Sequence, residues 1–213
     1  MERDFWASRW AEGRIGFHEG RANAHLVAHA SSLGTKKRVL VPLCGKAEDL
    51  MYLSNLGHAV VGVELVEEAA RAFFKEHGLV PQEAKNGAFT VLTSGPVTLV
   101  VGDFFATSRD LLGPIDALYD RAAIIALPLP MRQRYARHVQ SLMPKGSTGL
   151  IINLEYDQSL MDGPPFSVTE VELAENFAGL KLTCLASRPL TDNPRLAAAG
   201  ASARESCFAV DFA

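Results

Sequence analysis

The clearest pattern in the chain is an apolar run, a glycine turn, a helical repeat and a second apolar run, all within its first third. Residues 39–43 read Val-Leu-Val-Pro-Leu, without the polar alternation of a half-exposed strand, which predicts a parallel strand covered on both faces. After Gly45, residues of one helix face recur until Gly57 supplies a stop, and residues 59–63 form a β-branched strand that ends at Glu64. The pattern predicts a strand, helix, strand unit closed by an acid.

Later apolar patterns extend this unit into a sheet. Residues 88–92 and 97–101 predict two strands around a turn, and an amphipathic helix precedes them over residues 67–77. With strand 97–101 as the third strand, we expect a seven-stranded, mostly parallel, doubly wound (Rossmann-like) α/β sheet whose last two strands form an antiparallel hairpin at one edge. The remaining expected strands are residues 115–119, 150–154, 180–186 and 206–212, and the expected loops are residues 78–87, 163–165 and 188–202.

The chain length fits one domain, residues 1–213, with a helical extension over residues 1–35 and an α/β core over residues 36–213. A net charge of -3 gives no basic surface, so we expect no nucleic-acid partner. No apolar run approaches the length of a membrane span, and the charged start does not fit a signal peptide. The three cysteines lack C-x-x-C spacing and the six histidines form no ligand cluster, which favours a cytoplasmic protein without a metal. We expect a monomer.

Gly45 and Glu64 lie where open α/β sheets bind ligands, beyond the carboxyl ends of parallel strands. Glu64 follows Gly45 by 19 positions, close to the roughly 20 at which an acid binds a ribose hydroxyl pair. A dinucleotide fold needs G-x-G-x-x-G, whereas the turn at residues 43–48 has one glycine. A nucleoside cofactor without phosphates, such as S-adenosylmethionine (SAM), therefore fits better than NAD. The alternative is a plain α/β domain in which Glu64 is a solvated strand end.

Two tryptophans in the extension, Trp6 and Trp10, share one face of a predicted helix. They either pack on the domain or cover a bound ligand, since flat rings give a large contact area to heteroaromatic groups. The following loop, residues 13–18, ends in Phe17 and His18, and its glycines, aromatic ring and imidazole suit a flap over a ligand.

Two further strand ends carry charged residues. Asp103 and Phe104 follow strand 97–101, where Asp103 either bonds an adenine amino group, with Phe104 stacked on the ring, or caps the next short helix. Arg121 follows strand 115–119, where it either forms a salt bridge or holds a carboxylate or an electron-rich heterocycle through its forked donors.

Several separate motifs, in one order, resemble the thiopurine S-methyltransferase family, particularly its bacterial members. The resemblance covers residues 6–177, and the part from Gly179 onward matches poorly. The matching pieces are Trp6-x-x-x-Trp10 with Gly13 and Phe17-His18, Val-Pro-Leu-Cys-Gly-Lys at 41–46, Gly57-His58 through Glu64, Asp120-Arg121-Ala122-Ala123 with Ala126-Leu127-Pro128, and Gly-Pro-Pro-Phe at 163–166.

The resemblance implies a class I SAM-dependent methyltransferase that acts on the sulfur of small aromatic or heterocyclic thiols such as thiopurines, and in some relatives on selenium or tellurium species. Phe17, Arg121 and Arg195 would face the acceptor. A halide or thiocyanate methyltransferase and a non-catalytic SAM-binding module remain alternatives. By the resemblance, SAM would contact Trp6, Trp10, Phe17, Leu43, Glu64, Asp103, Phe104 and Arg121, and the spacing argument adds Gly45.

Methyl transfer to sulfur requires no covalent intermediate with the protein. Thiolate is the reactive form of the acceptor, and alignment and exclusion of water should supply most of the acceleration. We expect the charge of Arg121 to favour the anionic acceptor, with His18 as the alternative, acting as a general base. Cys44 is interpreted as a small residue in a tight turn rather than a nucleophile.

Overall fold

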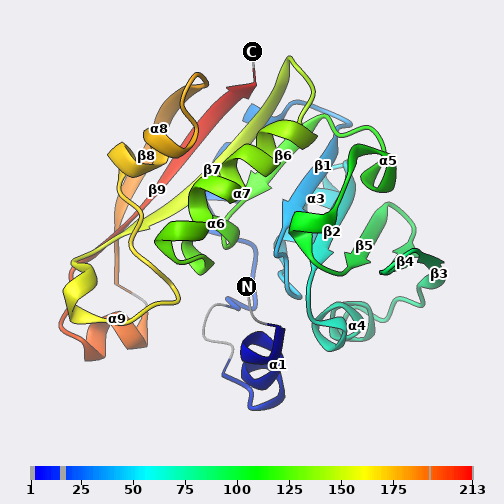
Figure 1. The fold of residues 1–213 in the computed structure, drawn as a ribbon, viewed down its shortest axis with the longest axis horizontal. Coiled ribbons are helices and arrows are strands. Elements are labelled where there is room, and N and C mark those ends of the chain that lie inside the picture. Colours follow the sequence, from blue (N-terminus) through cyan, green and yellow to red (C-terminus); the bar gives the residue numbers. More distant parts are fainter. Residues whose placement is uncertain (1–2, 15–17, 192, 213) are drawn as a thin grey trace.

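The computed structural model describes residues 3–14, 18–191 and 193–212 (Figure 1). The strands of this part of the chain form one nine-stranded sheet in the order β3-β4-β5-β2-β1-β6-β7-β9-β8. The strands are β1 (Arg38–Pro42), β2 (Ala59–Glu64), β3 (Gln82–Asn86), β4 (Phe89–Ser94), β5 (Val97–Val101), β6 (Ala117–Asp120), β7 (Ser147–Glu155), β8 (Lys181–Leu190) and β9 (Ala203–Phe212).

The centre of the sheet is parallel and both of its edges are antiparallel. Strands β5, β2, β1, β6 and β7 pair in parallel, so their carboxyl ends meet at one edge of the sheet. β4 joins β5 antiparallel on one side, and β9 and β8 extend the sheet antiparallel from β7 on the other. The predicted doubly wound class and the late antiparallel hairpin are therefore confirmed.

The predicted count of seven strands is wrong by two: β4 was expected as a strand but was not counted in the sheet, and β3 forms where a loop was expected. β3 is built from Gln-Glu-Ala-Lys-Asn, and every residue of it is exposed, so it has no apolar period from which a strand is predictable. Its pairing with β4 holds it in the sheet. The expected loop at residues 188–202 likewise contains the end of β8 and a short helix, α9.

The helices are short and lie around the sheet. α7 is the longest, with 14 residues, and no helix in the described ranges is long and apolar enough to cross a bilayer. The helices are α1 (Arg3–Ala11), α2 (Ala24–His29), η1 (Ala30–Leu33), α3 (Asp49–Asn55), α4 (Glu67–Glu76), η2 (Phe104–Ala106), α5 (Arg109–Leu112), α6 (Ala123–Ala126), α7 (Leu129–Leu142), η3 (Gln158–Leu160), α8 (Glu170–Asn176) and α9 (Pro194–Ala198).

The central strands are covered on both faces, as their continuous apolar sequence predicts. Successive residues of a strand point to opposite sides, and in β1 Leu40 joins one core cluster while Val39 and Val41 join the other. Tyr135 of α7 packs in the first cluster, and Figure 1 shows this helix in front of β6 and β7. Phe73 of α4 packs in the second cluster, so the amphipathic helix predicted over residues 67–77 buries its apolar face.

Asp120 closes β6 as a fully buried carboxylate and fixes the chain direction just before Arg121. Its Oδ1 accepts the backbone N–H groups of Ala123 at 3.0 Å and Ile124 at 3.4 Å, and its Oδ2 accepts the hydroxyl of Tyr135 at 2.7 Å. Burial raises the pKa of Asp120 from its ordinary value of 3.8 to about 6, against the opposite effect of these donors.

This shift predicts how the stability of the protein depends on pH. A raised pKa means that the folded state holds the proton more tightly, so the stabilisation is complete below 3.8 and is lost as the pH rises through about 6. Between those values, the wild type should lose up to about 1.4 kcal/mol of unfolding free energy per pH unit relative to Asp120→Asn. Denaturant titrations from pH 4 to 7 measure the difference, and parallel curves for the two proteins would contradict it.

Candidate active site

A cavity of about 770 Å³ opens at the carboxyl ends of the parallel strands. Its walls come from the turn after β1, the ends of β2 and β6, helix α1, the segments around Pro164 and Asn193, and the outer strands β8 and β9. Figure 1 shows α1 beyond this edge of the sheet, apart from the helices that cover its faces. Trp6, Trp10, His18, Leu43, Gly45, Glu64, Arg121 and Arg195, all predicted site residues, line the cavity.

The turn after β1 presents its backbone to the cavity. Leu43 has φ +49° and Gly45 has φ +54°, so two residues of the turn adopt the left-handed conformation. For a leucine this conformation is strained, and such strain concentrates at ligand-binding sites. The N–H of Cys44 donates to Val63 O at 3.1 Å, which ties the turn to the neighbouring strand β2. Cys44 itself is buried, and burial raises the pKa of its thiol well above 9.0, so it is a poor nucleophile.

Glu64 ends β2 and holds the turn in place. Its Oε2 accepts the N–H of Gly45 at 2.8 Å, and its Oε1 accepts the N–H of Val66 at 2.8 Å. Burial raises the pKa of Glu64, although these N–H donors act in the opposite direction. A carboxylate offers about four acceptor positions, so one that accepts a single N–H on each oxygen retains capacity for the two hydroxyls of a ribose. The site therefore fits the nucleoside half of SAM.

Helix α1 brings its tryptophans to the cavity. A Cβ atom built on Gly45 would lie 3.1 Å from Trp10 Cζ2 and 3.4 Å from Cη2, so the indole rests directly over this glycine. Trp6 also lines the cavity and meets Phe5 edge-on, with ring centroids 5.4 Å apart. Of the two alternatives for this aromatic pair, the placement favours a cover over the ligand site. Phe17 lies outside the described residues.

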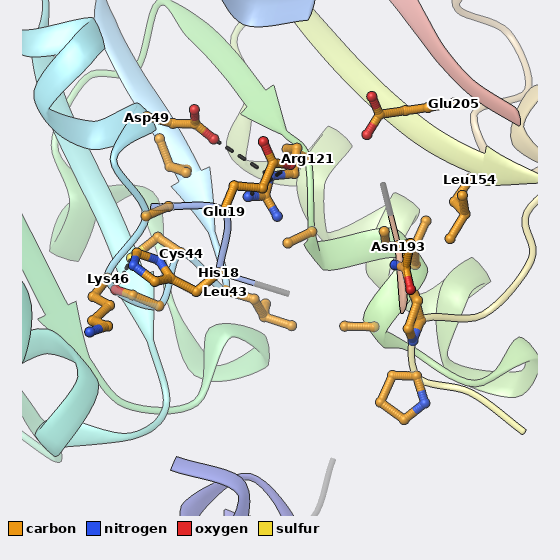
Figure 2. Close-up of a pocket in the computed structure, with 18 of the residues that line it drawn as sticks. His18, Glu19, Leu43, Cys44, Lys46, Asp49, Arg121, Leu154, Asn193 and Glu205 are labelled. Atoms are coloured by element: carbon orange, nitrogen blue, oxygen red, sulfur yellow. Dashed lines mark hydrogen bonds and ion pairs between the residues drawn. The ribbon is translucent and has the colours of Figure 1, made fainter. Parts of the chain in front are cut away.

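Arg121 sits between two carboxylates in the middle of the site (Figure 2). Its Nε lies 3.6 Å from Asp49 Oδ2, its Nη2 lies 3.4 Å from Glu19 Oε1, and its side chain is 11% exposed. Burial alone would lower the pKa of Arg121, but Asp49 and Glu19 outweigh it and raise the pKa. The guanidinium therefore keeps its charge inside the cavity. Both distances exceed the 2.7–2.9 Å of a tight charge-assisted hydrogen bond.

Asp49, which the sequence reasoning missed, organises this region. It is 1% exposed, accepts the N–H of Asn23 at 2.7 Å and accepts the hydroxyl of Tyr119 at 3.0 Å. Burial raises the pKa of Asp49, while Arg121 and these donors lower it. The only signal in the sequence was an acid directly before the apolar stripe of α3. Nothing local indicated its partners, which lie 26 and 70 residues away along the chain.

Arg195 lines the cavity while it anchors a loop. Its Nη1 donates to Pro164 O at 2.6 Å and its Nη2 to Asp162 O at 3.5 Å, so the guanidinium holds the segment that forms the opposite wall. Asn193 caps α9 by accepting the N–H groups of Arg195 and Leu196. The arginine that the resemblance placed on the acceptor side therefore also shapes that side through the backbone.

Asp103 and Phe104 do not line the cavity among the described residues. Asp103 Oδ1 accepts the N–H of Phe105 at 3.0 Å, which is the helix-capping alternative stated above. Phe104 is buried in the core, with its ring centroid 5.4 Å from Tyr135 and 5.1 Å from His138. In this structure Asp103 is exposed to solvent and Phe104 faces the core.

His18 lies on the cavity wall beside the turn after β1, and Figure 2 shows it close to Lys46 and Leu43. Its side chain is partly buried. Burial, and then the charge of Lys46, lower the pKa of His18 below 6.5, with Glu48 opposing them. The imidazole is therefore neutral near pH 7 and able to accept a proton.

The fold is shared with solved SAM methyltransferases. A 1,6-didemethyltoxoflavin N1-methyltransferase from Burkholderia thailandensis, solved with bound 1,6-didemethyltoxoflavin and S-adenosylhomocysteine, superposes with a TM-score of 0.65 at 20% identity, over 98% of this chain and 87% of the other. An arsenic(III) methyltransferase from Chlamydomonas reinhardtii superposes with a TM-score of 0.61 at 12% identity, over 84% and 65% of the two chains. The chain therefore has the fold of class I SAM-dependent methyltransferases.

Sequence comparison assigns the family within this class. Residues 1–209 match the family described as Thiopurine S-methyltransferase (TPMT), and the chain belongs to it. A thiopurine S-methyltransferase of Pseudomonas putida is 47% identical over 205 residues, which are 95% of each chain. One from Pseudomonas fluorescens is 48% identical over 182 residues, 84% of this chain and 82% of the other. The predicted family, enzyme class and methyl donor are confirmed, and the family implies a small-molecule methyl acceptor.

The contact between Trp10 and Gly45 predicts a matched pair of variants. Gly45→Ala and Gly57→Ala both place a side chain at a positive φ, at a cost of about 1 kcal/mol each. Only the methyl group added at position 45 would displace an indole, since nothing lies within 4 Å of a Cβ on Gly57. Calorimetry should show several-fold weaker binding of S-adenosylhomocysteine to Gly45→Ala and unchanged binding to Gly57→Ala. Equal affinities in the two variants would contradict a ligand site under Trp10.

Proposed function

We propose that this enzyme binds SAM at the Gly45 and Glu64 end of the cavity and methylates the sulfur of small aromatic or heteroaromatic thiols held between Arg121 and the β7 to β9 end. The observation that carries the proposal is a cavity in which a buried acid, Glu64, and a mostly buried arginine, Arg121, stand at the ends of parallel strands of one sheet. Such strand ends are where ligands of open α/β sheets bind.

The end of the cavity that binds the cofactor is built mainly from the backbone of the turn after β1. Glu64 binds the ribose hydroxyl pair, Leu43 and Gly45 allow the close approach of the main chain, and the two indoles of α1 cover the ligand. Arg121 borders both ends. Phe17 stays a predicted contact outside the described residues. Asp103 and Phe104 stay predicted adenine contacts, which would require η2 to rearrange, because Asp103 now caps it and Phe104 is buried.

Removal of the ribose acid tests the cofactor site. Glu64→Ala should weaken binding of S-adenosylhomocysteine roughly 100-fold, since hydrogen bonds to a charged group are worth about 1.5–3 kcal/mol each. Glu67→Ala is the matched control, because Glu67 pairs with Arg71 on α4, away from the cavity. Calorimetric titration measures both variants, with thermal unfolding as a check of folding. Tight binding by Glu64→Ala would remove this acid from the site, and no binding by the wild type would refute the cofactor assignment.

The residues of the acceptor end favour reaction of a thiolate. Bound SAM supplies a methyl group activated by its sulfonium. The positive charge of Arg121 attracts the anionic form of the acceptor, and the enclosure of its side chain strengthens this attraction by keeping water away. The cover formed by α1 excludes bulk water from the same space. No covalent enzyme intermediate is needed.

Two residues could account for the loss of the thiol proton. Arg121 would act through its charge, by lowering the acceptor pKa, and His18 would act as a base, with its own pKa lowered by burial. The first is our proposal, because Arg121 stands in the middle of the cavity, while Figure 2 shows His18 at the turn after β1.

The pH dependence of turnover separates the two roles. Without Arg121 the pKa of the bound acceptor thiol should be about one unit higher, because a positive charge within about 4–6 Å lowers an acidic pKa by roughly 1–3 units. The acidic limb of the rate profile for Arg121→Ala should therefore move to higher pH, and that for His18→Gln should stay in place. Rates measured from pH 5 to 9 on a thiophenol decide the matter. Loss of the acidic limb in His18→Gln would instead identify His18 as the base that accepts the thiol proton.

A further inference from the structure

A second buried acid, Glu205, lines the cavity from β9, four strand steps along the sheet from β2, which ends in Glu64. It belongs to β9, is 8% exposed and pairs in register with Leu154 near the end of β7. Figure 2 shows its carboxylate directed toward the part of the cavity where Arg121 lies, with Leu154 beside it. A buried carboxylate without partners is energetically unfavourable, so the contacts of Glu205 indicate which of its oxygens is left for a ligand.

Only one oxygen of Glu205 is used by the described residues. Oε2 lies 2.8 Å from Arg188 Nη2 on β8 and 3.4 Å from His25 Nε2 on α2. Oε1 accepts no hydrogen bond from any residue in the described ranges. Since Glu205 lines the cavity, Oε1 is an acceptor held in place by Arg188 and left for a ligand.

The position of Glu205 along the sheet places it on the acceptor side. From β2, which ends in Glu64, to β9 there are four strand steps through β1, β6 and β7. At about 4.8 Å a step, the two acids are separated by roughly 19 Å across the sheet. Arg121 follows β6, halfway between them. A nucleoside bound at Glu64 therefore leaves Glu205 to the second ligand.

The lining of the cavity suits a flat ring. Leu154, the partner of Glu205 in the sheet, gives apolar surface together with Ile125, Pro164 and Pro165, and the charged groups of Arg121 and Glu205 line the same cavity. A carbocyclic thiol would bury this acid without giving Oε1 a donor. A heterocyclic thiol with a ring N–H satisfies it, and its sulfur can face Arg121.

We propose that Glu205 Oε1 accepts a hydrogen bond from a ring N–H of the methyl acceptor, so that Glu205 selects N–H-bearing heteroaromatic thiols over carbocyclic thiols. This inference rests on the proposed function, since it assigns the acceptor end of the same cavity. A site built to bond a substrate N–H discriminates strongly against an analogue without it, because the buried polar group is then left unpaired.

The test compares three acceptors in the wild type and in Glu205→Gln: a heteroaromatic thiol with a ring N–H, the same ring with that nitrogen methylated, and thiophenol. Wild type should use the N–H thiol with a kcat/KM roughly 10- to 100-fold above that for its N-methyl form. Glu205→Gln should lose most of this preference, with thiophenol turnover and S-adenosylhomocysteine binding changed less than about threefold. Glu155→Gln, an exposed acid at the end of β7, is the matched control and should keep the preference.

Two outcomes overturn the inference. An equal loss for all three acceptors in Glu205→Gln would mean that the acid only supports the fold through Arg188 and His25. Equal kcat/KM values of the wild type for the N–H and N-methyl acceptors would exclude the hydrogen bond. This comparison uses the wild type alone, so it does not depend on whether a variant folds. Both differ from failure of the proposed function, in which the wild type would methylate no thiol at all.

Discussion

The hydrogen bonds from the backbone to Glu64 are the constraint on which the rest of the site depends. One carboxylate joins the end of β2 to the turn after β1, through Gly45, and to the start of α4, through Val66. The pairing of β1 with β2 keeps that turn in its strained form, with Leu43 at positive φ. Without this restraint, Leu43 should relax from the left-handed conformation, which is strained for a leucine.

A second restraint links the N-terminal extension to the reactive part of the site. Asp49 accepts the N–H of Asn23, the residue that caps α2, and contacts Arg121 with its other oxygen. Tyr119 on β6 holds the same carboxylate, so the helix, the sheet and the arginine share one buried acid. A shift of the extension would therefore move the charge that surrounds Arg121. The position of α2 and the electrostatics within the cavity are coupled through this carboxylate.

The parts of the structure that were predictable from the sequence are those specified locally. The apolar run of β1, the glycine turn and the acid that ends β2 lie within one strand, helix, strand unit. The local sequence pattern is therefore enough to predict this part of the site. Asp49 and Glu205 escaped prediction because their partners come from distant segments: 70 residues separate Asp49 from Tyr119, and His25 and Glu205 stand near opposite ends of the chain. β3 escaped because a solvent-exposed edge strand needs no apolar period.

The two ends of the cavity differ in what builds them, and this bears on specificity. The proposed cofactor end is formed by backbone amides and strand ends of the parallel core, to which Glu64 and the two indoles of α1 add side chains. The proposed acceptor end is formed by side chains of β8 and β9, by α9 and by a loop that Arg195 anchors through carbonyl groups. These segments lie outside the parallel centre of the sheet. Substitutions there can change which thiol fits while the cofactor end keeps its geometry, so specificity can change independently of methyl-donor binding.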